Sequence, residues 1–214
     1  MTAPLVSVDG IARRYAMRRG LFGRPVEIRA VDGVSFALAA GETLGIVGES
    51  GSGKSTTGRV VLGLEPADAG SVAFDGEALP QAGTPAWRRQ RARMQMIYQD
   101  PLGALDRRLA VADQIREPLD IHGHGDEKGR TERVGDLLAR VGLSADQGRR
   151  HPHELSGGQR QRAVLARALA TKPDFLVCDE PISALDVSIQ AQVVNLLVDL
   201  QADLGLAMLF ISHD

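Results

Sequence analysis

The chain has 214 residues, of which 43% are hydrophobic and 24% charged, and its formal net charge is −2. This composition is ordinary for a globular protein and predicts one large domain, or one domain with an inserted subdomain. The charge balance gives no argument for nucleic acid or an anionic membrane as a partner, and the single cysteine excludes an internal disulfide and any multi-cysteine zinc or iron–sulfur site.

The beginning of the chain has the alternation and the turn residues of an antiparallel β region. No signal peptide is visible, and no apolar run approaches the ~18 residues that span a bilayer, so we expect a protein that is cytosolic or faces the cytosol. The expected elements are strands at 5–11, 26–30, 34–38 and 71–74, a hairpin or loop at 17–25 and a turn at Asp32-Gly33.

A glycine-rich loop, GESGSGKST, follows an apolar strand at 44–47 and precedes a helical pattern. It fits the phosphate-loop pattern G-x-x-x-x-G-K-[ST], in which glycines let backbone N–H groups face a phosphate, the lysine adds positive charge and the serine ligates Mg²⁺. A chance glycine turn is the alternative, and the flanking strand and helix argue against it. The expected nucleotide-binding residues are Gly48, Glu49, Ser50, Gly51, Ser52, Gly53, Lys54, Ser55 and Thr56.

After this loop the pattern changes twice. A short basic helix at 85–93 and a strand at 94–98 lead to Gln99. From 101 to about 155 the chain reads as amphipathic helices without a strong strand, which predicts an inserted helical subdomain. The last part predicts a helix from about Ser156 to 170, a strand at 175–178, a helix at 187–204 closed by Gly205, and a strand at 206–211.

The strand at 175–178 runs directly into two carboxylates, Asp179 and Glu180. This is the form of a Walker B element, whose aspartate holds the Mg²⁺ that also contacts Ser55 of the loop. The adjacent Glu180 is placed to act as a general base on an attacking water. The alternative interpretation of this pair is a helix N-cap with surface charge, and the phosphate loop upstream argues against it.

Other polar residues have simpler interpretations. We prefer a solvated face to a polyanion site for the arginine clusters at 13–29 and 88–93. Cys178, inside the run FLVC, is expected to be a small buried hydrophobe. The histidines have no acidic or thiol partners in the pattern and are expected to be solvated loop residues, not metal ligands; they are His122, His124, His151 and His153.

The stretch LSGGQ at 155–159, followed by Arg160-Gln161-Arg162, resembles the signature sequence of ABC-type ATPases. Alone, it could be a helix start with Ser156 as N-cap. The order of elements, however, is also similar to that family: aromatic loop, Walker A, Q-loop, signature, Walker B, D-loop and switch histidine. The resemblance covers nearly the whole chain and implies an α/β P-loop core of ABC type, with an antiparallel β subdomain and an inserted α-helical subdomain, in a single domain over 1–214.

The resemblance also implies roles for individual residues. Tyr15 corresponds to the aromatic that stacks on adenine, although a core tyrosine is nearly as good an interpretation of it. Gln99 corresponds to the Q-loop residue that senses Mg²⁺ and the γ-phosphate, and His213 to the switch histidine that contacts the γ-phosphate. The remaining matches concern the opposite subunit of a dimer: the signature residues Ser156, Gly157, Gly158 and Gln159 would bind its ATP, and the D-loop at 183–186, with Asp186, would cross the interface.

Two further stretches narrow the resemblance. Gln99-Asp100-Pro101 followed by Leu105, and the segment at 183–192, are similar to the oligopeptide/dipeptide importer group. Within that group, LSGGQRQR and Arg19–Phe22 resemble the subunit that bears complete catalytic motifs. The resemblance implies an ATP-hydrolysing motor subunit that uses ATP and Mg²⁺. Its implied partners are a second ABC ATPase subunit, transmembrane permease subunits and, indirectly, a solute-binding protein.

The implied location is peripheral, on the cytoplasmic face of the inner membrane. Related importers carry nickel, glutathione or other small solutes, so these remain alternatives to peptides. The alternative function is that of an ABC-type ATPase in DNA repair or translation. Such ATPases usually have long coiled coils, zinc-binding cysteines or a second ATPase domain, and this sequence has none of these features. Because the family domain continues beyond a switch histidine, and this chain ends at Asp214, we also expect a missing C-terminal part.

Overall fold

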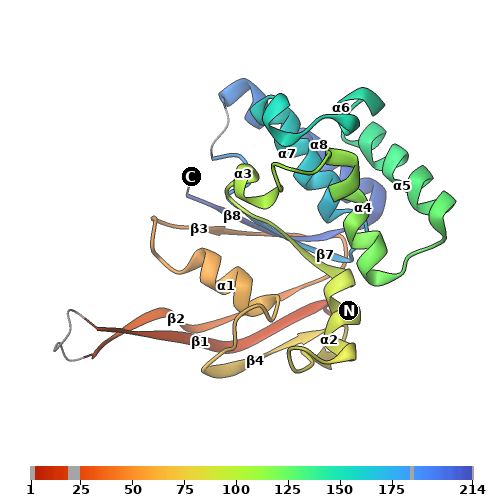
Figure 1. Ribbon diagram of the computed structural model, residues 1–214. Coiled ribbons are helices and arrows are strands. Elements are labelled where there is room, and N and C mark those ends of the chain that lie inside the picture. Colours follow the sequence, from red (N-terminus) through yellow and green to blue (C-terminus); the bar gives the residue numbers. More distant parts are fainter. Residues whose placement is uncertain (1–2, 19–24, 184–185, 214) are drawn as a thin grey trace.

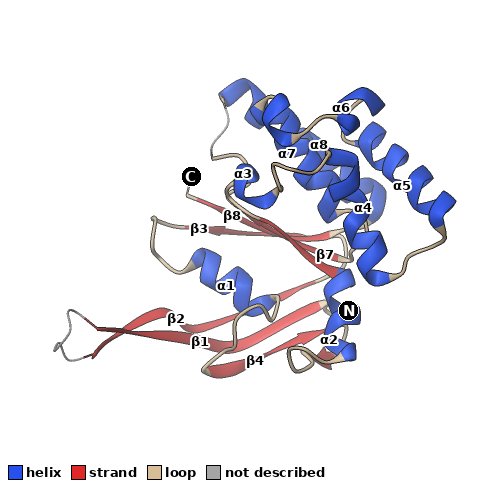
Figure 2. Cartoon of the chain, in the orientation of Figure 1, coloured by secondary structure: helices blue, strands red, loops and turns tan. Residues whose placement is uncertain are grey.

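The computed structural model describes residues 3–18, 25–183 and 186–213. The Arg19–Phe22 segment, and Ala184 and Leu185 of the expected D-loop, lie outside the described residues. Strands and helices occupy different layers: Figure 2 shows two separate groups of strands, with most of the helices gathered beyond one of them. In the described part of the chain, no helix is both long enough and apolar enough to cross a membrane.

Two four-stranded sheets form the frame of the fold (Figure 1). The first is antiparallel, and its strands in spatial order are β2 (Pro25–Leu38), β1 (Val6–Arg18), β4 (Ala69–Phe74) and β5 (Glu77–Ala78). The second is parallel, and its strands in spatial order are β3 (Thr43–Val47), β8 (Ala207–Ser212), β7 (Phe175–Asp179) and β6 (Met94–Ile97).

The antiparallel sheet corrects the sequence-based boundaries. The strands expected at 26–30 and 34–38 are one strand, β2, and β1 continues past Ile11 to include Tyr15. Gly33 has a φ of 71°, but the pairing of β1 with β2 continues past it through several register shifts. The glycine therefore marks an irregularity of bulge type within a continuous hairpin, where the sequence suggested a turn.

One hydrophobic core lies between the two sheets. Helix α1 (Lys54–Val61) is placed there, as Figure 1 shows, and buries Val60 and Val61 against residues of both sheets. From the parallel sheet this core takes Val177 and Ile211. Gly58 makes the close packing possible, because a Cβ at this position would lie 2.9 Å from Cγ1 of Val177.

A second core covers the opposite face of the parallel sheet. Leu176 and Cys178 of β7 point into it, and burial raises the pKa of the Cys178 thiol to about 12, as expected of a buried, unreactive cysteine. The helices around this core are α3 (Pro101–Ala104), α4 (Val111–His122), α5 (Glu127–Arg140), α6 (Ala145–Arg149), a 3₁₀ turn (Pro152–Glu154), α7 (Gly157–Ala168) and α8 (Val187–Leu204).

The basic helix α2 (Pro85–Arg93) is capped by Thr84 and has the bounds expected from the sequence. Its arginines are not all a solvated face, which corrects the first interpretation. Arg91 is half-buried and donates a 3.0 Å hydrogen bond to the carbonyl of Leu62, while Arg93 bridges Asp174 and Asp75. These two side chains tie α2 to neighbouring segments, Arg91 through a half-buried contact and Arg93 through ion pairs at the surface.

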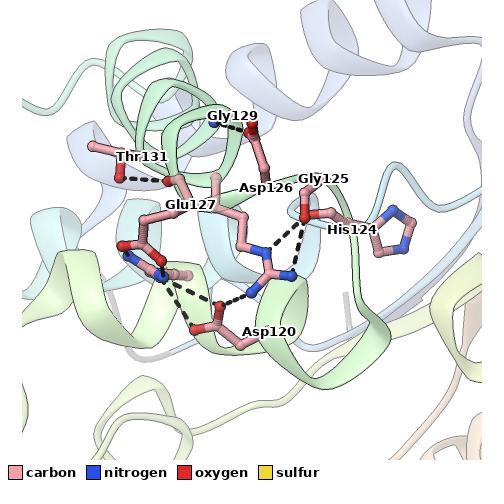
Figure 3. Close-up of polar contacts among 9 residues, drawn as sticks. Asp120, His124, Gly125, Asp126, Glu127, Gly129 and Thr131 are labelled. Carbon is pink, nitrogen blue, oxygen red and sulfur yellow. Dashed lines mark hydrogen bonds and ion pairs between the residues drawn. The ribbon is translucent and has the colours of Figure 1, made fainter.

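A network of charges closes the turn between α4 and α5 (Figure 3). Arg116 makes a two-pronged contact with Glu127, and Arg130 donates a 2.7 Å hydrogen bond to Asp120. Arg130 also donates to the carbonyls of His124 and Gly125, so it holds the turn itself.

His122 is the last residue of α4 and half-buried, and this burial lowers the pKa of its imidazole.

Candidate nucleotide site

The carboxyl ends of the four parallel strands meet at one edge. Val47 of β3 lies in register with Ser212 of β8, and Asp179 of β7 with Ile211. Residues that follow these strands therefore converge, which is where open α/β sheets bind ligands. The phosphate loop follows β3, His213 follows β8, Glu180 follows β7, and Gln99 comes shortly after β6.

The loop turns on two glycines with positive φ, 80° at Gly51 and 93° at Gly53. Gly53 is the N-cap of α1 and leaves no room for a side chain, because a Cβ there would lie 1.8 Å from the carbonyl oxygen of Ala30. Among the residues that the structure describes, no side chain caps this helix. Its first N–H groups therefore remain available to an anion at the mouth of the loop.

Lys54 lies inside the loop with only 6% of its surface exposed. Its ammonium group donates hydrogen bonds of 2.6 Å to the carbonyl of Gly48 and 2.8 Å to that of Glu49. These contacts hold a positive charge beside the N-terminus of α1. A polyphosphate is the class of ligand that such a cradle fits.

Ser55 and Asp179 are 124 positions apart, and the structure joins them: the Ser55 hydroxyl donates a 2.8 Å hydrogen bond to Oδ1 of Asp179. Asp179 is 4% exposed, and this burial raises the pKa of its carboxyl group. A hydroxyl and one carboxylate suit Mg²⁺, which binds few protein ligands and takes the rest from phosphate and water. The residues present therefore fit this metal.

Gln99, Glu180 and His213 form a second cluster. The Gln99 amide donates a 2.8 Å hydrogen bond to Oε2 of Glu180, and Nδ1 of His213 lies 3.6 Å from the same oxygen. Glu180 has a φ of 46°, a left-handed conformation that few non-glycine residues adopt, and its N–H donates to the carbonyl of Ile211. The described contact of Gln99 is with Glu180, so its expected role as a metal ligand remains a prediction.

An open cleft of about 710 Å³ connects this cluster to the phosphate loop. Its lining includes Glu49 and Ser50 from the loop, and Gln99, Glu180 and His213 from the other strand ends. The half-buried Ser183 also lines it, and the hydroxyl of Ser183 donates to the carbonyl of Glu180. The cleft therefore joins the two expected catalytic residues, Glu180 and His213, to Gln99 and to the first part of the phosphate loop.

The signature residues lie elsewhere. Ser156 caps α7, and its side chain and that of Gln159 bond each other's backbone N–H groups in a capping box. Gly158 is buried, and a Cβ there would lie 2.7 Å from the Ile189 side chain. Helix α7 packs on the opposite face of the parallel sheet from α1 (Figure 1). The chain thus does not bring its own signature to its own phosphate loop, and Asp186 is an exposed residue at the start of α8.

Tyr15 lies on β1, opposite Ile28 of β2, and is half-buried. Its hydroxyl donates to the carboxylate of Glu65, and the guanidinium of Arg13 lies 5.0 Å from the centre of its ring. The sequence pattern did not single out Glu65, and it placed Arg13 in a cluster expected to be a solvated face, whereas the Arg13 side chain is only 20% exposed. No motif marks them, because the contact joins residues 50 positions apart that only the fold brings together.

Comparisons with known proteins identify the family and the fold of this chain. A family model described as "ABC transporter" matches residues 31–183. A putative peptide import ATP-binding protein of Brucella abortus (strain 2308) is 50% identical over 98% of this chain, which covers 63% of that protein. The glutathione import ATP-binding protein GsiA of Salmonella typhimurium (strain LT2) is 49% identical over 99% of this chain, which covers 34% of GsiA. The chain thus spans less than two thirds of the length of each of these curated relatives.

Two solved structures have the same fold. A dimeric post-hydrolysis state of the ATP-binding cassette MJ0796, bound to ADP and Pi, superimposes with a TM-score of 0.84 and 27% identity, covering 98% of this chain and 88% of that one. CbiO1 from Clostridium perfringens, part of the transporter complex cbiONQ, superimposes with a TM-score of 0.83 and 25% identity, covering 100% of this chain and 80% of that one.

Proposed function

The chain belongs to the ABC transporter family, and we propose that it is the ATP-binding and ATP-hydrolysing motor subunit of an importer for di- or oligopeptides. One observation carries the proposal: the phosphate loop, the Ser55–Asp179 pair and the cluster around Glu180 lie at the same edge of the parallel sheet. The proposed domain is a single ABC-type unit over 1–214, with a helical subdomain at about 101–155.

In this proposal each part of the edge has its own task. The loop N–H groups and Lys54 bind the phosphates of ATP, and Tyr15 stacks on the adenine. Ser55 and Asp179, with Gln99 nearby, hold a Mg²⁺ ion, which supplies positive charge to the phosphate oxygens when bound. Glu180 accepts the proton of the attacking water. Positioning and charge stabilisation provide most of the catalysis of phosphoryl transfer, and these residues supply both.

His213 contributes to the same step from the end of β8. Its imidazole is 50% exposed and lies at the mouth of the cleft, so it can reach a γ-phosphate held by the loop. Gln99 can reach the same group from the end of β6. Gln99 and His213 both contact Glu180 in this structure, so a ligand that binds either side chain must replace that contact.

The proposed active form contains two such subunits. The phosphate loop leads into α1 on one face of the parallel sheet, and the signature begins α7 on the other, so a second subunit is needed to place Ser156, Gly157, Gly158 and Gln159 against the bound ATP. The dimeric state of MJ0796 supports this arrangement for a relative. Asp186 would lie at the interface between the subunits.

Transport requires partners that span the membrane. We propose that the helical subdomain passes the motion of the ATP site to permease subunits, with the protein bound peripherally at the cytoplasmic face of the inner membrane. A solute-binding protein would deliver the solute to the permease. The relatives named for peptide import and for glutathione import favour a peptide-like solute.

The test is reconstitution of the full-length protein with its permease in lipid vesicles. ATP hydrolysis that rises with a short peptide or glutathione on the opposite side supports the proposal. ATP hydrolysis that ignores the permease and rises with DNA or ribosomes would contradict it and restore the rival function in repair or translation. The absence of ATP binding by the wild-type protein would contradict both.

A further inference from the structure

We propose that Glu65 is a positioning residue for nucleotide-base recognition: it fixes the ring of Tyr15 and links it to the helix that follows the phosphate loop. The inference rests on the proposed ATP site and adds to it a residue outside every sequence motif. Glu65 lies in the connection between α1 and β4, and its side chain is only 22% exposed.

Both carboxylate oxygens of Glu65 are in use. Oε1 accepts a 3.2 Å hydrogen bond from Arg59 of α1, and Oε2 accepts the hydroxyl hydrogen of Tyr15 on β1. The Nε atom of Arg13 lies 3.7 Å from Oε2. The carboxylate therefore joins the phosphate-loop helix to the strand that carries Tyr15, and hydrogen bonds to a charged partner are stronger than neutral ones.

Arg13 occupies one face of the Tyr15 ring. Its guanidinium lies 5.0 Å from the ring centre, within the range of a cation–π contact, and Nη1 is held by a 3.1 Å hydrogen bond to Asp68. With the hydroxyl fixed by Glu65 and one face covered by Arg13, the opposite face is the one left for a planar ligand.

The position of this ring suits the base of a nucleotide held by the loop. Tyr15 pairs with Ile28 on β2, and two residues further on, Ala30 places its carbonyl against Gly53 of the phosphate loop. An open cleft of about 450 Å³ lies at Tyr15, lined also by Arg14, Glu27 and Asp68. Strand β2 thus runs from the loop to the ring.

The base-dependent part of the affinity is the quantity that tests this role. It is the ratio of the dissociation constant of inorganic tripolyphosphate, which has no base, to that of ATP, both measured by calorimetry on the full-length protein. Glu65→Leu removes both hydrogen bonds, and we expect this ratio to fall about fivefold while tripolyphosphate binding stays unchanged. Glu65→Gln keeps an oxygen that can accept from Tyr15, so it should recover part of the loss.

A second variant leaves the contacts of Glu65 with Arg13 and Arg59 intact, so it avoids any effect on folding that the loss of those contacts would have. Tyr15→Phe removes only the hydroxyl and should lower the ratio by a similar factor, and the double variant Tyr15→Phe/Glu65→Leu should lose no more than Glu65→Leu alone. Glu132→Gln, a change at an exposed carboxylate of α5, is the matched control and should leave the ratio unchanged.

The outcomes separate this inference from the proposed function. Equal losses of ATP and tripolyphosphate affinity in Glu65→Leu, additive losses in the double variant, or an unchanged ratio would overturn the positioning role. A wild-type protein that binds ATP no more tightly than tripolyphosphate would overturn it too, and would leave the phosphate site standing. Failure of the wild-type protein to bind either ligand would instead overturn the proposed function.

Discussion

The side-chain amide of Gln99 donates a hydrogen bond of 2.8 Å to the carboxylate of Glu180. The two residues are 81 positions apart and follow neighbouring parallel strands, β6 and β7, whose ends lie in register. The contact fixes the direction of the Glu180 carboxylate, which has a side-chain exposure of only 14%. It also means that the group proposed as general base is already oriented before a substrate arrives.

Replacing that carboxylate separates binding from turnover. Glu180→Gln keeps the shape of the side chain but cannot accept a proton, so we expect ATP binding to persist and hydrolysis by the full-length protein to fall at least about 100-fold. Equilibrium binding of ATP and the rate of phosphate release measure the two quantities. Glu154→Gln, at an exposed carboxylate, is the control, and normal turnover in Glu180→Gln would contradict the base assignment.

Removing the charge of the phosphate loop should weaken binding itself. In Lys54→Ala the phosphates lose a buried ammonium group, and we expect ATP affinity to fall at least about tenfold. Lys128→Ala removes an equal charge from the surface of α5, where the side chain is 84% exposed, and should have no effect. Equal ATP affinities in the two variants would contradict the proposal that this loop binds the phosphates of ATP.

Two glycines of the loop give a matched pair. In Gly53→Ala the new Cβ meets the carbonyl of Ala30, and we expect the free energy of unfolding to fall by about 3 kcal/mol and ATP binding to be lost. In Gly51→Ala the backbone strain is similar but nothing lies within 4 Å, so a loss of about 1 kcal/mol is expected. Chemical denaturation measures both, and a larger loss in Gly51→Ala would refute this account.

Asp179 sets function against stability. Because burial raises the pKa of its carboxyl group, the ionised side chain is costly to the nucleotide-free fold. We expect Asp179→Asn to increase the free energy of unfolding by about 1 kcal/mol and to abolish the Mg²⁺ dependence of ATP binding. Denaturation without nucleotide tests the first effect, and ATP titration with Mg²⁺ or EDTA the second. A less stable variant that still responds to Mg²⁺ would contradict both.

The charge network at the α4–α5 turn predicts a dependence on pH. The hydrogen bond from Arg130 lowers the pKa of Asp120, and that from Arg116 lowers the pKa of Glu127. Both carboxylates are therefore easier to ionise in the folded than in the unfolded state. Their contribution to stability is present above their ordinary pKa values of 3.8 and 4.5 and is lost as the pH falls through the lower, folded values.

Denaturation curves of wild type and Glu127→Gln test this dependence. The difference in unfolding free energy should be present at about pH 7 and should shrink as the pH falls below 4.5, the ordinary pKa of Glu127. Glu132→Gln changes a carboxylate on the same helix with only a long, exposed contact to Lys128 and should show no such difference. A difference that grows as the pH falls would contradict the assignment.

Much of the fold could be predicted from the sequence where local signals agree. Helix α2 has the expected bounds because Thr84 and Pro85 mark its start, and α8 because Gly205 ends it with a φ of 65°. The predicted boundaries of the strands in the β1–β2 hairpin were wrong, because a glycine within a strand and a glycine in a turn look alike in sequence until the pairing partner is known.

The site followed the same division. The motif spacing predicted a partnership of Ser55 and Asp179, and the structure places them in contact. The grouping of Gln99, Glu180 and His213 depended on the resemblance to a family, because their separation in the sequence carries no signal. Glu65 could not be predicted, since neither its spacing nor its neighbours differ from those of an ordinary surface carboxylate; only the fold brings Tyr15 to it.

The hydrogen bond from the N–H of Glu180 to the carbonyl of Ile211 ties the end of β7 to the end of β8. His213 is two residues beyond that carbonyl, so this one backbone hydrogen bond couples the positions of Glu180 and His213. A displacement of the end of β8 that moves His213 therefore also moves Glu180. Any chain segment or partner that stabilises the end of β8 would orient both side chains together.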